Sequence, residues 1–164
     1  MNKIDLIGEV IEFHFGEYLA YALITHFNQR YGYLARLFEP KFKSQIEDIQ
    51  SLRHHKFRMN VYMPLNTAIR GKGVKVRGKL ELKKEELSPP TFRSPMVINS
   101  SGVCPGWEII GGEKTTRVPA LTREQSKYSD IGIYNLAAIK YQYDNNLFPN
   151  SIEKLNNGPI AFEP

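Results

Sequence analysis

Residues 17–38, EYLAYALITHFNQRYGYLARLF, carry the strongest structural signal in the chain. Two runs rich in aliphatic and aromatic residues flank a polar break at residues 28–30. Residues of these types suit the half-buried surface of a sheet, and two such runs on either side of a short turn predict a β-hairpin. We expect this hairpin to lie at the centre of a sheet and to contribute core groups rather than catalytic ones.

Apolar and polar residues also alternate on both sides of the hairpin, which predicts further strands. The alternation runs loosely through residues 4–15, with a kink at Gly8. It returns in residues 57–63, where Pro64 ends the predicted strand because proline cannot donate to a sheet ladder. These strands extend the sheet that the hairpin begins.

The middle of the chain is interrupted by turn-forming residues. Residues 88–102 are rich in Pro, Ser, Asn and Gly and predict a long loop. A short strand over residues 106–110 follows and carries Trp107, which we expect in the core. The Gly111-Gly112 pair predicts a tight turn, because glycine accepts a positive φ without strain.

Helix signals lie in two places. Residues 44–47 and 122–125 have the form of capping boxes, in which each side chain satisfies a free backbone donor at a helix start. Asp130 is a candidate cap for a longer helix that ends before Pro149, and residues 151–155 predict a final turn or two. The C-terminal third is therefore predicted to be helical.

Length and composition indicate one folded domain. The chain has 164 residues, of which 41% are hydrophobic and 24% charged, so it can bury a core without disulfides or metals. We expect a single α+β domain over residues 1–164, with a twisted antiparallel sheet, helices packed on it and the helical C-terminal third.

The sequence also predicts the cellular location of the protein. Acidic residues interrupt the first apolar run, and no stretch approaches the roughly 18 apolar residues of a membrane span, so we expect neither a signal peptide nor membrane binding. The single cysteine, Cys104, rules out an internal disulfide and suits a reducing compartment. We expect a cytoplasmic protein.

The net charge of +5 comes from one segment. Between Arg70 and Lys84 the chain has seven basic residues and one acidic residue, so the remainder is close to neutral. A period of two in this segment predicts a strand with one aliphatic and one cationic face. The aliphatic face comprises Val74, Val76, Leu80 and Leu82, and the other face comprises Lys75, Arg77, Lys79, Glu81 and Lys83.

Three interpretations of the cationic face stay open. Lysines on an edge strand can simply be solvated and prevent unwanted strand pairing. They can also bind an acidic protein partner, or they can bind the phosphate backbone of a nucleic acid.

No set of residues has the spacing of a catalytic or metal site. His54 and His55 are adjacent and cannot converge on one ion, and Cys104 has no basic neighbour to activate its thiol. A ribonuclease would need an acid and a base flanking a phosphate, which only His14, His26 and the lysines could supply. We expect no enzymatic activity, cofactor, metal ion or small-molecule substrate.

The same hairpin opens a series of motifs that resembles the bacterial immunity protein 26 family. The first motifs are Tyr21-Ala22-Leu23-Ile24-Thr25-His26, Tyr31-Gly32 and Leu34-Ala35-Arg36-Leu37-Phe38. The later ones are an apolar strand ending in Pro-Leu at residues 57–65, Pro-x-Phe-Arg at residues 90–93, a Trp-containing strand and turn at residues 107–113, and residues 118–125 and 131–135. They follow in the family's order over most of residues 7–149.

The resemblance implies a non-enzymatic protein that binds and neutralises the toxin domain encoded beside it, with a nuclease the commonest expectation. The setting would be contact-dependent growth inhibition, or a type VI secretion or related polymorphic-toxin system. An inhibitor of this kind needs a preformed surface whose charge complements its target. Our candidate contact residues are Lys75, Arg77, Lys79 and Lys83, followed by Arg30 and Tyr31 at the hairpin turn.

Two other classes of function remain as alternatives. A small β-rich nucleic-acid-binding module would use the basic strand at residues 74–83 against phosphates. A hydrolase would depend on His14 or His26. The hairpin itself is expected to be scaffold, and the cationic strand is expected to make the contact.

Overall fold

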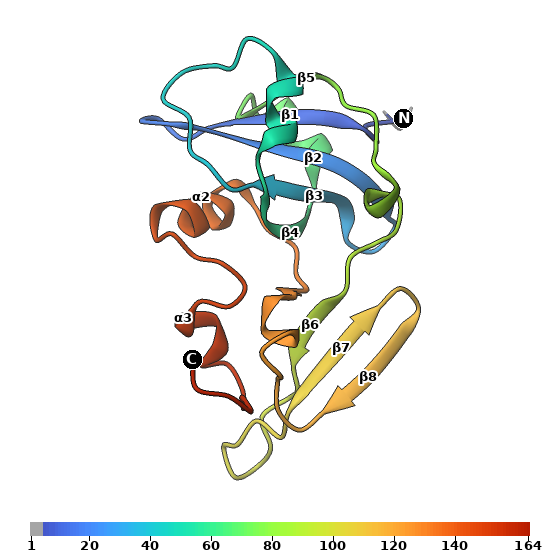
Figure 1. The fold of residues 1–164 in the computed structure, drawn as a ribbon, viewed down its shortest axis with the longest axis vertical. Helices are drawn as coiled ribbons and strands as arrows, with labels where there is room; N and C mark the ends of the chain where they lie inside the picture. Colours follow the sequence, from blue (N-terminus) through green and yellow to red (C-terminus); the bar gives the residue numbers. More distant parts are fainter. Residues whose placement is uncertain (1–4) are drawn as a thin grey trace. The chain divides into compact units, whose positions relative to one another are not determined.

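A computed structural model describes residues 5–164, and the chain forms two compact units (Figure 1). The first unit comprises Met1–Ser88 with Gly132–Asn146, and the second comprises Pro89–Ile131 with Leu147–Pro164. Each unit has its own sheet, so the predicted α+β class is confirmed. The single domain over residues 1–164 stays a prediction.

The first unit contains a five-stranded antiparallel sheet in the order β4-β3-β2-β1-β5. The strands are β1 Glu9–His14, β2 Leu19–Asn28, β3 Gly32–Phe38, β4 Phe57–Met63 and β5 Val74–Lys79. The predicted hairpin is β2 and β3, and β2 is the central strand. The predicted strands before and after the hairpin are confirmed as β1 and β4.

Both faces of this sheet are covered by apolar side chains. Successive side chains of a strand point to opposite faces. Ile11, Phe13 and Ala22 accordingly belong to one buried cluster, whereas Val10 and Tyr21 belong to another. The core of the first unit therefore lies on both sides of β2, which explains why six consecutive residues of that strand are buried.

The hairpin turn is closed by a side chain and by a glycine. The Asn28 side-chain oxygen accepts hydrogen bonds from the backbone N–H groups of Arg30 and Tyr31, at 2.8 and 3.1 Å. Gly32 has φ +89°, and a Cβ there would lie 2.7 Å from the carbonyl oxygen of Met63 on the next strand. The Tyr31-Gly32 motif thus meets a backbone requirement.

The helices of the first unit differ from the predicted ones. They are the 3-10 helix η1 Ile49–His54, α1 Leu65–Arg70, the 3-10 helix η2 Lys84–Glu86, and α2 Leu136–Asp144. No signal in the sequence predicts α1. The predicted helix start at residues 44–47 is wrong, because Asp48 caps η1 by accepting from Gln50 N.

The predicted start of the C-terminal helix is also wrong, whereas its predicted end before Pro149 is confirmed. Asn135, not Asp130, caps α2, and its side-chain oxygen accepts from Ala138 N at 2.8 Å. Asp130 has an ion-pair partner instead and lies in a strand. The helix ends at Asp144, before Pro149, and Asn146 follows with φ +50°.

The second unit contains a four-stranded sheet in the order β8-β7-β6-β9. The strands are β6 Phe92–Pro95, β7 Trp107–Gly111, β8 Lys114–Val118 and β9 Ser129–Asp130. The long loop predicted over residues 88–102 is wrong in its middle, because β6 pairs there with β7 and β9. The strand bearing Trp107 is confirmed, and the predicted glycine turn lies at Gly112-Glu113, because Gly111 is still paired in β7 and, of the two glycines, only Gly112 has a positive φ.

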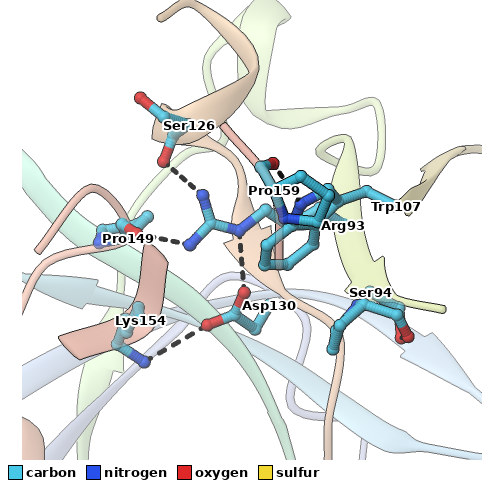
Figure 2. Close-up of polar contacts among 9 residues, drawn as sticks. Arg93, Ser94, Trp107, Ser126, Asp130, Pro149, Lys154 and Pro159 are labelled. Atoms are coloured by element: carbon cyan, nitrogen blue, oxygen red, sulfur yellow. Dashed lines mark hydrogen bonds and ion pairs between the residues drawn. The ribbon is translucent and has the colours of Figure 1, made fainter. Parts of the chain in front are cut away.

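Arg93 holds the second unit together (Figure 2). Its buried guanidinium donates to Asp130 Oδ1 at 2.8 Å, to Ser126 O at 2.7 Å and to Pro149 O. It also lies 5.2 Å from the ring of Trp107, which is fully buried and so is core, not an exposed interface residue. One side chain thereby joins β6, β9 and the segment before the last helix.

The C-terminal third is helical only in part. Thr122 and Gln125 form the reciprocal hydrogen bonds of a capping box, yet only the 3-10 turn η3 Gln125–Lys127 follows them. Beyond α2, the predicted final turn is α3 Ile152–Leu155. Strands β8 and β9 also lie in this third, and most of its other residues form turns or irregular backbone.

Replacing Gly32 with alanine should destabilise the protein more than replacing Gly16. Both glycines have φ near +90°, but only Gly32 faces a close carbonyl oxygen. Gly16→Ala isolates the backbone strain, about 1 kcal/mol, and Gly32→Ala adds a clash that raises the loss to about 3 kcal/mol. Urea denaturation of the two variants checks this, and equal losses would contradict the steric argument.

Replacing Arg93 with lysine should cost about 3 kcal/mol of unfolding free energy, because an ammonium group cannot serve three fixed acceptors in this buried site. The matched control is Arg117→Lys, which alters an exposed ion pair with Glu108 and should change stability by less than about 0.5 kcal/mol. Denaturant titrations that gave the two variants similar stability would refute the assigned role of Arg93.

Candidate partner-binding surface

Strand β5 forms one edge of the five-stranded sheet and pairs with β1. Glu9 lies opposite Lys79 and Glu12 opposite Lys75, and the register shifts between Val10 and Ile11. Gly78 lies at this irregularity with φ +134°, a conformation that favours glycine. The strand predicted over residues 74–83 is therefore confirmed only over Val74–Lys79, as an edge strand with a bulge, and residues 80–83 lie outside it.

The bulge overturns the predicted aliphatic face. Val74 packs in the cluster with Phe13, but Leu80 and Leu82 pack in the other cluster, with Val10. An inserted residue shifts the period of two, so apolar residues before and after Gly78 point to opposite faces of the sheet. Val76, the remaining residue of the predicted aliphatic face, is 43% exposed and so does not belong to the core.

Three of the four cations predicted to make contact from residues 74–83 are exposed. Lys75 and Lys79 lie on β5, and Lys83 lies just before η2. Lys75 pairs with Glu12, on the face of Val10, whereas Lys79 pairs with Glu9, on the other face, so these lysines line the sheet edge and do not share one face. We call the three residues along this edge the lysine surface. An edge strand that carries lysines resists pairing with another chain, and a local excess of positive charge attracts acidic partners.

The backbone beneath Lys83 is fixed by buried charges. Lys83 N donates to Glu86 Oε2 at 2.8 Å, and Arg53 Nη1 lies 2.8 Å from Glu86 Oε1. Arg36 Nη2 donates to Ser88 O at 2.9 Å. These contacts hold the segment after β5 in one conformation, so the lysine surface is largely preformed.

Arg77 has a different environment from the three lysines. Its Nη1 lies 3.1 Å from Oε2 of Glu12, which is fully buried, and its Nη2 donates to Ile46 O at 3.3 Å. A partner that used Arg77 would have to compete with this ion pair. The structure therefore separates Arg77 from the lysine surface.

Glu12 connects several side chains that sequence reasoning did not bring together. Its Oε2 accepts from the Tyr21 hydroxyl at 2.8 Å, and its Oε1 lies 2.6 Å from His14 Nε2. Because a carboxylate only accepts, that imidazole nitrogen carries a proton. Tyr21 in turn accepts from Ile46 N. The signal in the sequence was an acid within an apolar strand, two residues before a histidine.

The network around Glu12 has a structural function. Tyr21 and Arg77 both bond to the backbone of Ile46, so they hold that segment over one face of the sheet. Burial, together with the hydrogen bond to Glu12, raises the pKa of Tyr21 to about 12. The hydroxyl stays protonated and continues to donate at neutral pH.

Arg30 and Tyr31 form a separate group at the β2–β3 turn. The Arg30 guanidinium lies 5.3 Å from the Tyr31 ring centroid, and that ring lies 5.2 Å from the ring of Tyr62. Strand β1 lies between β2 and β5 in the sheet. The structure does not bring the turn residues and the lysine surface into one cluster.

The other candidate residues have structural contacts. His26 Nε2 lies 2.9 Å from Leu87 O, and the Cys104 sulfur lies 3.4 Å from Met96 O and 3.2 Å from Gly106 O. Within residues 5–164, no three His, Cys, Asp or Glu side chains could hold a metal ion together. In the same residues, no helix has the length and hydropathy needed to cross a membrane.

Comparisons with protein families, curated proteins and solved structures found no match for this chain.

The raised pKa of Tyr21 predicts how stability changes in alkali. Below pH 10 both the folded and the unfolded chain hold the proton. Between pH 10 and about pH 12 only the folded chain keeps it, so the contribution of Tyr21 to stability falls as pH rises through this window. Tyr21→Phe should lose stability less steeply across the window than the wild type.

Ultraviolet absorbance of tyrosinate provides the check. The difference between the wild-type and Tyr21→Phe titrations should be one proton released near pH 12. Release near pH 10, the ordinary tyrosine value, would contradict the buried hydrogen bond to Glu12.

Proposed function

We propose that this chain is a cytoplasmic immunity protein that binds and neutralises the toxin domain of a contact-dependent growth inhibition or related polymorphic-toxin system. The observation that carries the proposal is the colinear resemblance to the immunity protein 26 family. The structural roles of the motif residues support the proposal, because Gly32 allows a tight turn, Arg93 bonds to Asp130 inside the second unit, and Trp107 is buried in its core. A family of inhibitors with different targets would share a scaffold and vary its surface.

The lysine surface is the proposed contact. Lys75, Lys79 and Lys83 are exposed on a backbone that is fixed by the sheet and by Glu86. Charges of this kind raise the rate of association with an acidic surface and disfavour partners of like charge. Inhibition then follows from binding alone, without catalysis by the immunity protein.

The sign of the charge bears on how a nuclease toxin would be inhibited. A nuclease binds its polyanionic substrate through a cationic groove. A lysine surface would be repelled by that groove, so we propose that it binds an acidic region outside the active site. Inhibition then comes from steric exclusion or distortion rather than from filling the catalytic groove.

Charge reversal tests the contact. Lys75→Glu, Lys79→Glu and Lys83→Glu combined should weaken binding to the toxin domain encoded by the neighbouring gene by about tenfold or more, mainly through slower association. Lys56→Glu, which reverses another exposed lysine of the first unit, should change the affinity less than about twofold. Surface plasmon resonance gives both rates.

Co-expression with the same toxin domain tests the function itself. The proposal is wrong if the wild-type chain forms no complex and the cells still die.

A second candidate function, binding to a nucleic-acid backbone, is favoured by the same exposed lysines. If the three lysines contact three phosphates of duplex DNA, the logarithm of the association constant should fall with the logarithm of the salt concentration, with a slope of about −2.7. Weak binding that is insensitive to salt would eliminate it.

A further inference from the structure

The loop between β6 and β7 exposes an unusual amount of apolar surface. We call residues 96–105 the finger. Val97 is 88% exposed, Ile98 63% and Val103 55%. Val97 is the most exposed large apolar residue of the described chain, and the three lie within seven positions. Scattered exposed apolar residues are ordinary, but a group of them marks an interaction site.

Hydrogen bonds keep the finger rigid. Its base is closed by Met96 N, which donates to Gly106 O at 2.9 Å, and by the Cys104 sulfur, which lies 3.4 Å from Met96 O and 3.2 Å from Gly106 O. Near its tip, Asn99 N donates to Val103 O at 2.9 Å. The conformation that presents the apolar side chains already exists before binding, so little entropy is lost when a partner binds.

The Asn99 side chain completes the tip. Its oxygen accepts from the backbone N–H groups of Ser101 and Val103, both at 3.0 Å. Gly102 N donates to Asn99 O, and Gly102 has φ +76°. The tip is therefore polar, and the apolar side chains lie on the two arms behind it.

The chemistry of the finger selects its partner. Residues 94–107 contain no charged side chain, although 24% of the whole chain is charged. The matching surface is therefore uncharged and apolar. A lipid bilayer would meet the polar tip first, and segments that insert into membranes usually add basic or aromatic residues, which the finger lacks. A protein groove can enclose the apolar arms and leave the tip in solvent.

A hollow of about 470 Å³ lies beside the finger. It is lined by Ile98, Val103 and Cys104 on one side and by residues 156–159 on the other. A ridge next to a hollow can interlock with the side chains of a partner, which flat apolar surface cannot do.

We propose that the finger is the apolar anchor of the complex with the toxin domain and inserts Val97 and Ile98 into an uncharged groove of that protein. This inference rests on the proposed function. Lysines are depleted from the centres of protein interfaces, and binding energy concentrates in buried, desolvated anchors. The finger accordingly sets the dissociation rate of the complex.

The test measures both rates on the purified toxin domain. Combining Val97→Ser and Ile98→Ser should speed dissociation about tenfold or more and leave association nearly unchanged. The matched control is Ile152→Ser, because Ile152 is 54% exposed on α3 of the same unit and should not matter. Asn99→Ala keeps the apolar side chains but loosens the tip, and it should give a smaller increase in the dissociation rate.

Other results overturn the inference in distinguishable ways. If the wild type binds the toxin domain and the Val97/Ile98 variant dissociates equally slowly, the finger is not the anchor, but the proposed function stands. If the wild type does not bind at all, both proposals fail. Sedimentation that shows a homodimer lost in the variant would assign the finger to a second copy. Binding of the wild type, but not the variant, to anionic phospholipid vesicles would assign it to membranes.

Discussion

Apolar cover on both faces of the five-stranded sheet is the constraint on which the first unit depends. Every polar group on the inner strands must find a partner inside the protein, because water cannot reach it. Glu12 bonds to Tyr21 and Arg77, and Arg36 bonds to Thr25 and to carbonyl oxygens of the segment after β5. These buried polar groups therefore fix the segments that cover the sheet, and one of those segments carries Lys83.

Much of the fold was accessible from the sequence where the signal is local. The hairpin and strand β4 were predicted because their apolar residues and turn residues act within a few positions. The phase change at Gly78, the strand β6 inside a proline-rich stretch and the role of Asp130 were not predictable. Each depends on a partner far away in the chain: Val10 on β1, Ser129 on β9 and Arg93 on β6.

The candidate site likewise has features that the sequence predicts and features that it does not. Exposure of Lys75 and Lys79 follows from their place on an edge strand, but the bulge at Gly78 breaks the predicted alternation, and Lys83 lies beyond the strand. Pairing of Arg77 with Glu12 does not follow from the local sequence, since it needs the register of β1 against β5. The finger did leave a signal, an uncharged run with Val97 and Ile98 beside an Asn-Ser-Ser-Gly turn. That signal predicts only a loop, because a local sequence pattern does not show whether the apolar residues of a loop are buried.

The pairing of β5 with β1 also ties the lysine surface to the order of folding. Glu9 lies opposite Lys79, 70 positions later in the chain, whereas β2 and β3 meet across a short turn. Closing so long a loop costs entropy before it gains contacts, so the hairpin needs far less of the chain than β5 does. A chain leaving the ribosome displays the scaffold motif before Lys75 and Lys79 reach their fixed spacing. Binding through these lysines is therefore possible only after β5 has paired with β1 and the first sheet is complete.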